Sequence, residues 1–321
     1  MTLHTAQGIR FYDHEPATED FLGAVLAGLR RRPRSIPPKF FYDAEGSRLF
    51  DRICETPEYY PTRTEMQIMR RHAADIARHL GDECLLVEPG SGSSEKVRLL
   101  LEALRPHAYL PMDISRDHLL AAAKRLADEY PWLEIHAACV DFTHPLALPY
   151  HPDGVRAVAF FPGSSIGNFE PGDAVRFLGN IRRMVGEGGG LLIGVDLKKD
   201  PVLLESAYND AAGVTAAFNL NLLHRINREL EADFDAGAFR HEARYDADRG
   251  RVEMHLVSEC AQAVTVAGER FDFAPGESIH TENSYKYRVE EFQALAEQAG
   301  FRPEAVWTDA AGLFSVHYLA A

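Results

Sequence analysis

The sequence lacks the basic surface that nucleic-acid-binding proteins require. Of its 321 residues, 34 are Lys or Arg and 48 are Asp or Glu, which gives a net charge of -14. Proteins that bind nucleic acid usually carry a basic patch, because neutralising phosphates supplies most of their affinity. The densest basic segment, residues 30–34, lies among prolines and is typical of a solvated loop. We therefore expect no nucleic-acid partner.

Long apolar runs and local metal motifs are also missing. No run approaches the ~18 apolar residues of a membrane helix, and the N-terminus lacks the apolar core of a signal peptide. The four cysteines, Cys54, Cys84, Cys139 and Cys260, form no C-x-x-C pair, and the fourteen histidines form no H-E-x-x-H motif. We expect a reduced, cytoplasmic protein with no membrane partner and no metal. No long apolar stripe demands a second subunit, so we expect a monomer.

The central part of the chain alternates between strand-like and helix-like segments. Continuous apolar runs predict buried strands at residues 84–88, 108–113, 133–139, 155–161 and 190–196. Helical spacing predicts helices at residues 94–104, 115–130 and 172–185, with Ser93 or Ser94 capping the first. Such an alternation predicts an α/β fold with a parallel sheet covered by helices on both faces.

The end of the chain adds a helix and a hairpin. Residues 289–299 have amphipathic helical spacing and are followed by Gly300, a common residue after helix ends. Residues 304–308 and 314–319 then predict two antiparallel strands. Five parallel strands followed by a helix and a terminal hairpin match the Rossmann-like sheet of class I methyltransferases, with an antiparallel strand ending the sheet.

A long insertion separates the fifth strand from the last helix. It begins with predicted helices at residues 201–212 and 215–230 and continues with strands such as residues 251–257. We expect residues 1–60 and 198–285 to form a discontinuous α+β substrate-binding domain. Residues 61–197 and 286–321 then form the cofactor-binding domain. Because ligands of open α/β sheets bind at the carboxyl ends of the strands, the second domain is placed to shape the substrate pocket.

A glycine loop, LLVEPGSGSSEK, follows the first predicted strand of this sheet. A phosphate-binding P-loop needs Gly directly before its Lys, but Glu95 precedes Lys96. A dinucleotide fingerprint needs a third glycine at the position of Glu95, where a carboxylate would face the pyrophosphate. S-adenosylmethionine has no phosphate, so Gly90 and Gly92 can allow its close approach without this penalty. Lys96 pairs either with the cofactor carboxylate or with Glu95.

Two strand ends supply further polar groups for such a cofactor. Asp113 ends the second strand, where its carboxylate can accept both hydroxyl hydrogens of a ribose. Asp141 and Phe142 follow the third strand, where the acid can accept from the adenine amine and the ring can cover one face of the base. Together with the glycine loop, these residues favour S-adenosylmethionine.

Several longer motifs make the similarity more specific. They are PPKFFYD at residues 37–43, TPEYYPTRTE at 56–65, GSSIGN at 163–168, AYNDAAGVTAAFN at 207–219 and TENS at 281–284. From about residue 34 to its end, the chain resembles the L-histidine Nα-methyltransferases of ergothioneine biosynthesis. The resemblance implies trimethylation of the α-amino group of L-histidine to hercynine, with S-adenosylmethionine converted to S-adenosylhomocysteine.

The resemblance also implies a role for individual residues. By position, the cofactor contacts fall on Tyr42, Gly90, Lys96, Asp113, Asp141 and Phe142. The amino-acid substrate contacts fall on Tyr59, Asn168, Tyr208, Met254, Glu282, Asn283 and Ser284. Among these, Glu282 and Ser284 are the expected imidazole contacts. The chain departs from the family pattern at Pro89, His280 and Tyr285.

The chemistry requires a neutral amine as the nucleophile. No His or Lys stands out as a base, so we expect the proton to leave through water or through a tyrosine, Tyr42 or Tyr59, which are the candidate catalytic residues. Tyrosine faces can also stabilise a quaternary ammonium product. Two alternatives remain open from the sequence. One is an N-methyltransferase acting on another aromatic amino acid or a histidine derivative, and the other is a non-catalytic S-adenosylmethionine sensor.

Overall fold

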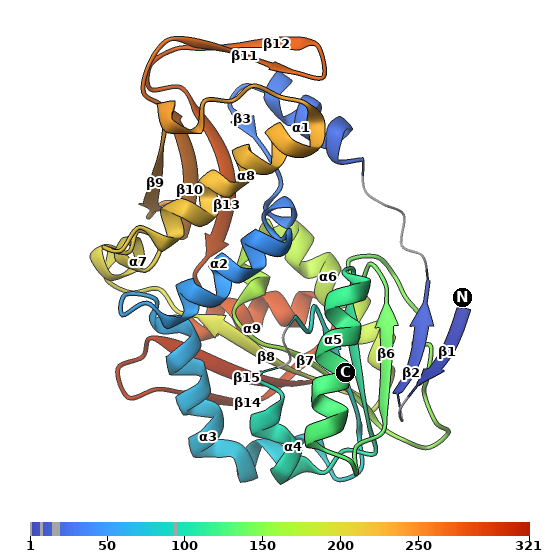
Figure 1. Ribbon diagram of the computed structural model, residues 1–321. Helices are drawn as coiled ribbons and strands as arrows, with labels where there is room; N and C mark the ends of the chain where they lie inside the picture. Colours follow the sequence, from blue (N-terminus) through green and yellow to red (C-terminus); the bar gives the residue numbers. More distant parts are fainter. Residues whose placement is uncertain (1, 7–8, 15–19, 93–94) are drawn as a thin grey trace.

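A nine-stranded sheet forms the larger part of the computed structural model, which describes residues 2–6, 9–14, 20–92 and 95–321 (Figure 1). Its strands follow the order β1 (Thr2–Ala6), β2 (Ile9–Asp13), β6 (Ile135–Cys139), β5 (Ala108–Asp113), β4 (Leu85–Pro89), β7 (Ala157–Phe161), β8 (Gly190–Asp196), β15 (Phe314–Ala320) and β14 (Arg302–Thr308). Neighbouring strands from β2 to β8 are parallel. The predicted parallel sheet and C-terminal hairpin are therefore confirmed.

The hairpin enters the sheet in a way that the sequence analysis did not specify. Strand β15 is antiparallel to both β8 and β14, and it lies between them. The last strand of the chain is therefore an inner strand, and β14 forms the edge. This placement buries β15 almost throughout, whereas β14 alternates between buried or half-buried and exposed positions.

Helices cover both faces of the large sheet, as the buried strands predict. Helices α3 (Tyr60–Leu80), α4 (Arg98–Leu104) and α5 (Arg116–Glu129) pack on one face. Helices α6 (Pro171–Val185) and α9 (Val289–Gln298) pack on the other. Helix α4 begins later than predicted, because residues 95–97 form a turn. The predicted caps Ser93 and Ser94 lie outside the described residues.

The first strands of the chain belong to the large sheet and not to the substrate-binding region. Strand β2 pairs in parallel with β6, and Ile9 and Phe11 are buried in the sheet core. The Tyr12 hydroxyl and His136 Nδ1 lie 2.9 Å apart. The expected assignment of all of residues 1–60 to the second domain is thus wrong for these strands. Their pairing covers an edge of β6 that would otherwise expose unpaired backbone groups.

A second region is built around a four-stranded sheet. Its strands follow the order β3 (Arg34–Ser35), β13 (Ser278–Tyr285), β10 (Arg251–Ser258) and β9 (Phe239–Asp246), with a separate hairpin of β11 (Gln262–Val266) and β12 (Glu269–Phe273). Its helical segments are α1 (Phe21–Arg30), η1 (Pro38–Phe41), α2 (Ala44–Glu55), α7 (Pro201–Ala207), α8 (Val214–Leu230) and η3 (Ala236–Ala238). One hydrophobic cluster joins residues 25–60 with residues 204–279. We propose that this cluster is the core of the substrate-binding region.

The second region lies at one end of the large sheet (Figure 1). The short helix η2 (Ser165–Asn168), which follows β7, contacts both β8 and β13. The carboxyl end of the parallel sheet therefore faces the four-stranded sheet, where the two regions can form a site together. Within the described residues, no helix has both the length and the apolar character needed to span a membrane.

Candidate active site

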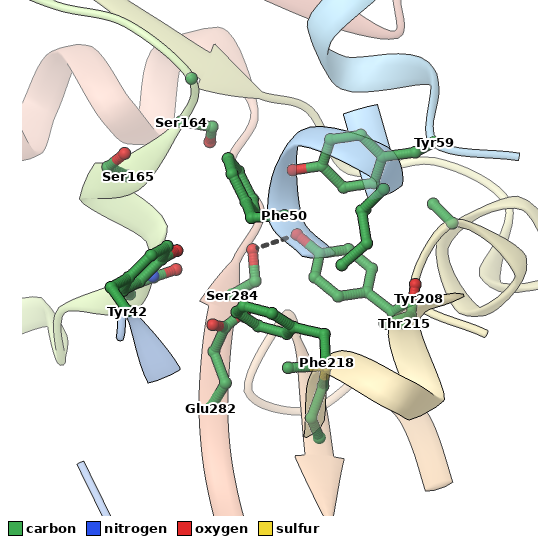
Figure 2. A pocket seen from close by; sticks show the side chains of 15 residues that line it. Tyr42, Phe50, Tyr59, Ser164, Ser165, Tyr208, Thr215, Phe218, Glu282 and Ser284 are labelled. Atoms are coloured by element: carbon green, nitrogen blue, oxygen red, sulfur yellow. Dashed lines mark hydrogen bonds between the residues drawn. The ribbon is translucent and has the colours of Figure 1, made fainter. Parts of the chain in front are cut away.

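A pocket lies where the two regions meet. Its cavity is about 510 Å³ when the open space at its mouth is included. The lining residues are Tyr42, Phe50, Ile53, Tyr59, Gly163, Ser164, Ser165, Asn168, Ala207, Tyr208, Thr215, Phe218, Met254, Glu282 and Ser284. Figure 2 shows these side chains around one space, with Tyr59 and Glu282 on opposite sides. The pocket is mixed in character, with aromatic walls and a few polar groups.

The structure brings together most of the residues that the sequence assigned to the substrate. Six of these seven residues line the pocket, namely Tyr59, Asn168, Tyr208, Met254, Glu282 and Ser284. They come from five separate elements or element ends, with only the last two on the same strand. Asn283 does not line the pocket, because successive residues of a strand point to opposite faces. Its Nδ2 donates instead to Glu170 Oε1 at 3.0 Å.

Aromatic rings form a continuous wall around the pocket. The Tyr42 and Phe218 ring centroids are 5.8 Å apart, and Tyr42 and Phe50 are separated by the same distance. The Tyr59 ring lies 6.1 Å from that of Tyr208 and 6.4 Å from that of Phe50. Edge and tilted contacts of this kind leave ring faces available to a ligand. Such faces attract cations, so the wall suits an amine and even more a quaternary ammonium group.

Glu282 and Ser284 form the polar side of the pocket. Both point inward from β13, because they are two residues apart. Burial raises the pKa of Glu282 to about 7, against the opposing charge of Lys286. Ser284 Oγ accepts hydrogen bonds from the Tyr208 hydroxyl at 2.7 Å and from Lys286 Nζ at 2.8 Å. Since both lone pairs of Ser284 are occupied, its own hydrogen remains to be donated.

A buried ion-pair network lies behind this polar side. Lys286 Nζ donates to Asp196 Oδ2 at 2.7 Å and to the Tyr208 hydroxyl at 2.9 Å, in addition to Ser284. Lys199 Nζ donates to Asp196 Oδ1 at 2.6 Å, and both Asp196 and Lys286 are fully buried. Burial alone would raise the pKa of Asp196, but the two lysines together lower it. The network fixes the Ser284 and Tyr208 hydroxyls in one arrangement.

A second ion pair links the glycine loop to the pocket. Lys96 Nζ lies 2.5 Å from Glu65 Oε2, and both Glu65 oxygens accept from the backbone N–H of Gly163, at 2.9 and 3.0 Å. Lys96 therefore pairs with Glu65 from α3, and not with Glu95 as one reading of the sequence allowed. Glu95 instead pairs with Arg98. Because Gly163 lines the pocket, this ion pair lies at the junction between the substrate pocket and the predicted cofactor loop.

The glycine loop has the local geometry for close contact with a ligand. Gly90 and Gly92 have φ angles of +69° and +50°, which side chains rarely adopt. A Cβ at Gly90 would lie 3.1 Å from the Phe142 ring. The buried Ser91 Oγ has no hydrogen-bond partner in the described part of the chain. Phe142 thus covers Gly90, whereas Gly92 has no atom of the described residues within 4 Å of a Cβ and leaves its backbone open, beside the unused Ser91 hydroxyl. Pro89 ends β4 just before the loop.

The acidic residues predicted for the cofactor lie at the ends of two neighbouring strands, β5 and β6. Asp113 Oδ2 accepts from the Gly92 N–H at 3.2 Å, which ties the end of β5 to the loop. Asp141 follows β6 and accepts from the Thr143 N–H at 2.9 Å. Ile114, directly after Asp113, is a large apolar side chain that is 49% exposed. Asp113 and Phe142 thus border the loop, and the exposed Ile114 adds an apolar surface next to Asp113 that the sequence did not predict.

Several other contributors were missed because their signals are not local. Phe50 and Thr215 line the pocket, but an amphipathic helix contains many such residues. Glu65 stands in one of the quoted motifs, yet its partner Lys96 is 31 residues away. The local sequence signal for the buried network is Asp196, an aspartate that ends a buried strand. Asp113 ends a strand in the same way, so this pattern alone does not distinguish a buried ion pair from a cofactor contact.

Comparisons with known proteins show what this chain is similar to. The model of a family described as histidine-specific, S-adenosylmethionine-dependent methyltransferases matches residues 21–321. A histidine N-alpha-methyltransferase of Mycolicibacterium smegmatis is 46% identical, and the match covers 98% of each chain. The ergothioneine biosynthesis protein 1 of Neurospora crassa is 32% identical over 86% of this chain and 32% of that protein. A solved methyltransferase from Clostridium acetobutylicum has a TM-score of 0.45 and 12% identity, covering 78% of this chain and 91% of that one.

Proposed function

The chain belongs to the family of histidine-specific, S-adenosylmethionine-dependent methyltransferases, and from this membership we propose that it trimethylates the α-amino group of L-histidine to hercynine, the first step of ergothioneine biosynthesis. The observation that supports this assignment most directly is that Glu282 and Ser284 lie together on one side of the pocket. The similarity to a histidine N-alpha-methyltransferase and to an ergothioneine biosynthesis protein supports the same substrate and pathway.

The polar side of the pocket matches a neutral imidazole ring. Such a ring has one N–H donor and one nitrogen acceptor. Glu282 supplies a carboxylate acceptor, and Ser284 supplies a hydroxyl hydrogen, because its lone pairs are used by Tyr208 and Lys286. An indole ring has a donor but no acceptor, so it would leave the Ser284 hydrogen unpaired. We infer that this donor–acceptor pair selects histidine over other aromatic amino acids.

The opposite side of the pocket suits the amino and carboxylate groups of the substrate. Tyr59 presents a hydroxyl and a ring opposite Glu282, and Asn168, which also lines the pocket, can hold either group without adding a charge. As methyl groups accumulate, the amine loses its N–H donors and gains bulk. The faces of Tyr42, Tyr59 and Phe218 can then stabilise the ammonium cation, at roughly 0.5 to 2 kcal/mol for each well-placed ring.

The candidate catalytic tyrosines act by position and not as phenolates. Burial, followed by the nearby Tyr208, raises the pKa of Tyr59 well above its usual value. Loss of solvent, followed by the charge of Glu282, raises the pKa of Tyr42. Both hydroxyls therefore stay protonated near pH 7. We propose that Tyr42 and Tyr59 orient the neutral amine and that its proton leaves to water, so that alignment and desolvation supply most of the rate.

The residues around the glycine loop fit S-adenosylmethionine, which supplies the methyl group when bound. Asp113 is placed to accept from the ribose hydroxyls, while Ile114 and Phe142 offer apolar surface to the adenine. Asp141 can accept from the adenine amine. Lys96 can contact the cofactor carboxylate while it keeps its bond to Glu65. Tyr42, which lines the pocket, and Gly90, which gives the loop its positive φ, complete this set.

We also propose a cytoplasmic monomer. The four cysteines are all free, which is in keeping with a reducing compartment. Tyr42 lines the pocket, and the other large apolar side chains that are exposed among the described residues are scattered over separate elements: Ile114, Trp132, Val202 and Val306. Isolated apolar side chains of this kind are normal on the surface of a monomer.

One experiment separates this function from its alternatives. The purified chain is incubated with S-adenosylmethionine and an equimolar mixture of histidine, tryptophan, tyrosine and phenylalanine, and products are identified by mass spectrometry. Trimethylated histidine, fragmenting with all three methyl groups on the α-nitrogen, is the expected result. A different methylated amino acid would replace the substrate assignment. Binding of S-adenosylmethionine without any product would favour a sensor and contradict the proposed activity.

A further inference from the structure

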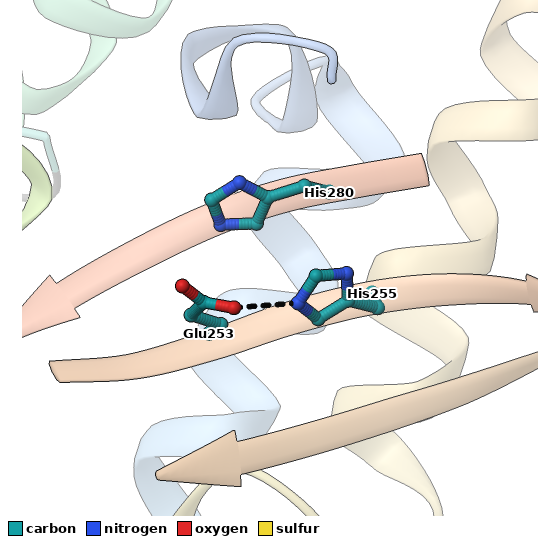
Figure 3. A group of neighbouring side chains, drawn as sticks. All are labelled: Glu253, His255 and His280. Carbon is teal, nitrogen blue, oxygen red and sulfur yellow. Dashed lines mark hydrogen bonds and ion pairs between the residues drawn. The ribbon is translucent and has the colours of Figure 1, made fainter. Parts of the chain in front are cut away.

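A cluster of metal-ligating side chains lies on the four-stranded sheet outside the pocket. Glu253 and His255 come from β10 and His280 comes from β13, and Figure 3 shows the three side chains grouped on these two strands. Each offers one ligand atom, and the three atoms lie within 4.8 Å of one another. The two histidine rings stack with centroids 4.8 Å apart and an interplanar angle of 20°.

A β-bulge creates this cluster. Met254 pairs with Glu282, but the next residue, His255, pairs with His280, so Thr281 is left without a partner on β10. Without this extra residue, His280 would share the pocket face with Glu282. The bulge instead places His280 beside His255, as bulges commonly re-aim side chains. Thr281 Oγ1 lies 2.8 Å from Asn219 Oδ1 and 3.1 Å from the Met254 carbonyl oxygen, which fixes the bulge.

The surroundings of the three residues already orient them. Glu253 Oε1 accepts from Arg251 Nε and Nη2, at 2.9 and 2.6 Å, which leaves Oε2 directed at His255 Nε2, 2.9 Å away. His255 Nδ1 lies 3.4 Å from Ser278 Oγ. Metal-binding carboxylates and imidazoles typically have such outer partners, which hold the ligand atoms in place. The side chains of Glu253 and His255 are only 12% and 9% exposed.

We propose that Glu253, His255 and His280 bind a divalent transition-metal ion, with Zn²⁺ as the ion that fits best. Two imidazole nitrogens and one carboxylate oxygen are a common zinc ligand set, and water completes the four-coordinate geometry. Bonds of about 2.0 to 2.2 Å place tetrahedral ligand atoms roughly 3.4 Å apart. The 2.9 Å contact between Glu253 Oε2 and His255 Nε2 must therefore open slightly, while any pair separated by up to 4.8 Å must close, and small side-chain rotations can supply both changes. Binding exchanges the contact between Glu253 and His255 for two metal bonds.

The site is separate from the proposed methyl transfer but is attached to the substrate pocket. The pocket side chains Met254 and Glu282 belong to the same two strands and point to the other face. His280 Nε2 lies 2.9 Å from the backbone oxygen of Glu282. A metal ion that fixes the His280 ring therefore holds the strand position that carries the Glu282 carboxylate. The expected consequence is a more rigid β10–β13 pair.

The metal alone tests this proposal, because free histidine would compete for it. An untagged chain is treated with a chelator, dialysed, and titrated with Zn²⁺ by calorimetry in histidine-free buffer. Co²⁺ then serves as a spectroscopic probe of tetrahedral coordination. We expect one equivalent of Zn²⁺ to bind, to raise the unfolding temperature, and to be matched by the visible absorption of tetrahedral Co²⁺. A parent chain that binds neither ion would overturn the proposal.

Three variants locate the ion. His255→Ala and His280→Gln should each weaken Zn²⁺ binding at least tenfold and abolish the Co²⁺ absorption. His224→Ala, an exposed histidine on α8, should leave both unchanged. Thermal unfolding without metal shows whether each variant is folded, and the more conservative His280→Gln decides the matter if His255→Ala is not. Binding that persists unchanged in the folded ligand variants would assign the ion elsewhere and contradict the proposal.

Discussion

Lys286 Nζ lies 2.8 Å from Ser284 Oγ, and this contact determines what the serine can offer to a ligand. The lysine directs its other hydrogens to Asp196 and to Tyr208, so all three have acceptors. Ser284 is thereby fixed as a hydrogen donor toward the pocket. The specificity of the pocket for an acceptor nitrogen thus depends on a lysine that lies behind the pocket wall.

The alternation of side chains on β13 gives the first prediction. Ser284→Ala removes the donor and should raise the KM for histidine about 3- to 10-fold, as expected for one lost hydrogen bond. The KM for S-adenosylmethionine should stay the same. Asn283→Ala is the matched control, because Asn283 is next to Ser284 on the strand but its own side chain faces Glu170. Steady-state kinetics with each substrate varied separately make the comparison, and equal histidine KM values in the two variants would contradict the assignment.

The buried carboxyl of Glu282 gives a prediction on stability. Its pKa of about 7 lies above the value of an unfolded chain, because burial disfavours the charged form. Folding therefore favours the protonated group, and stability is lost as the pH rises from the unfolded pKa through 7. Glu282→Gln removes this loss. We expect the variant to be more stable than the parent at pH 8, by roughly 2 to 3 kcal/mol, and nearly equal to it at pH 4.5.

Thermal or urea unfolding at both pH values checks this prediction. Glu259→Gln, on the exposed surface, should show no such pH-dependent gain. A Glu282→Gln variant whose stability relative to the parent is the same at pH 4.5 and pH 8 would contradict the inferred pKa. The same variant should have a raised KM for histidine, because an amide is a weaker acceptor than a carboxylate. Stability and substrate recognition thus oppose each other at this residue.

Asp113 gives a prediction on the cofactor. Asp113→Asn keeps the size of the side chain but removes the charge and one acceptor, so the dissociation constant of S-adenosylhomocysteine should rise about 10- to 100-fold. Asp117→Asn is the control, since its side chain is 97% exposed on the following helix. Calorimetric titration measures both. An unchanged dissociation constant for Asp113→Asn would remove this residue from the proposed ribose site.

The sequence predicted the large sheet well because its signals are local. The run at residues 190–195 is apolar, and β8 occupies it together with Asp196. The sequence did not predict β2, because its apolar pattern is short and the strand depends on its pairing with β6. Within the site, Asn283 was included because TENS was treated as one motif, although a strand divides its side chains between two faces.

The missed residues of the site depend on contacts between distant parts of the chain. Lys286 lies two residues after the TENS motif at residues 281–284, but only the fold places Asp196 beside it. The expectation of no metal rested on motifs within single segments. The inferred metal site instead needs two strands and the bulge at Thr281, which no spacing rule on one strand reveals. Sequence patterns thus predict elements more readily than the polar networks between them.

The glycine loop gives a last prediction that separates strain from ligand contact. Gly90→Ala places a Cβ 3.1 Å from the Phe142 ring at a φ of +69°. Gly188→Ala has a similar φ of +76° but no atom within 4 Å of its Cβ. Both variants should lose about 1 to 2 kcal/mol of stability from the left-handed backbone. Only Gly90→Ala should also displace Phe142 and thereby weaken S-adenosylhomocysteine binding. We expect the dissociation constant to rise about tenfold, which corresponds to ~1.4 kcal/mol of lost binding free energy. Calorimetry on both variants, corrected for the folded fraction, tests this difference, and equal affinities would show that Phe142 and Gly90 do not border the cofactor.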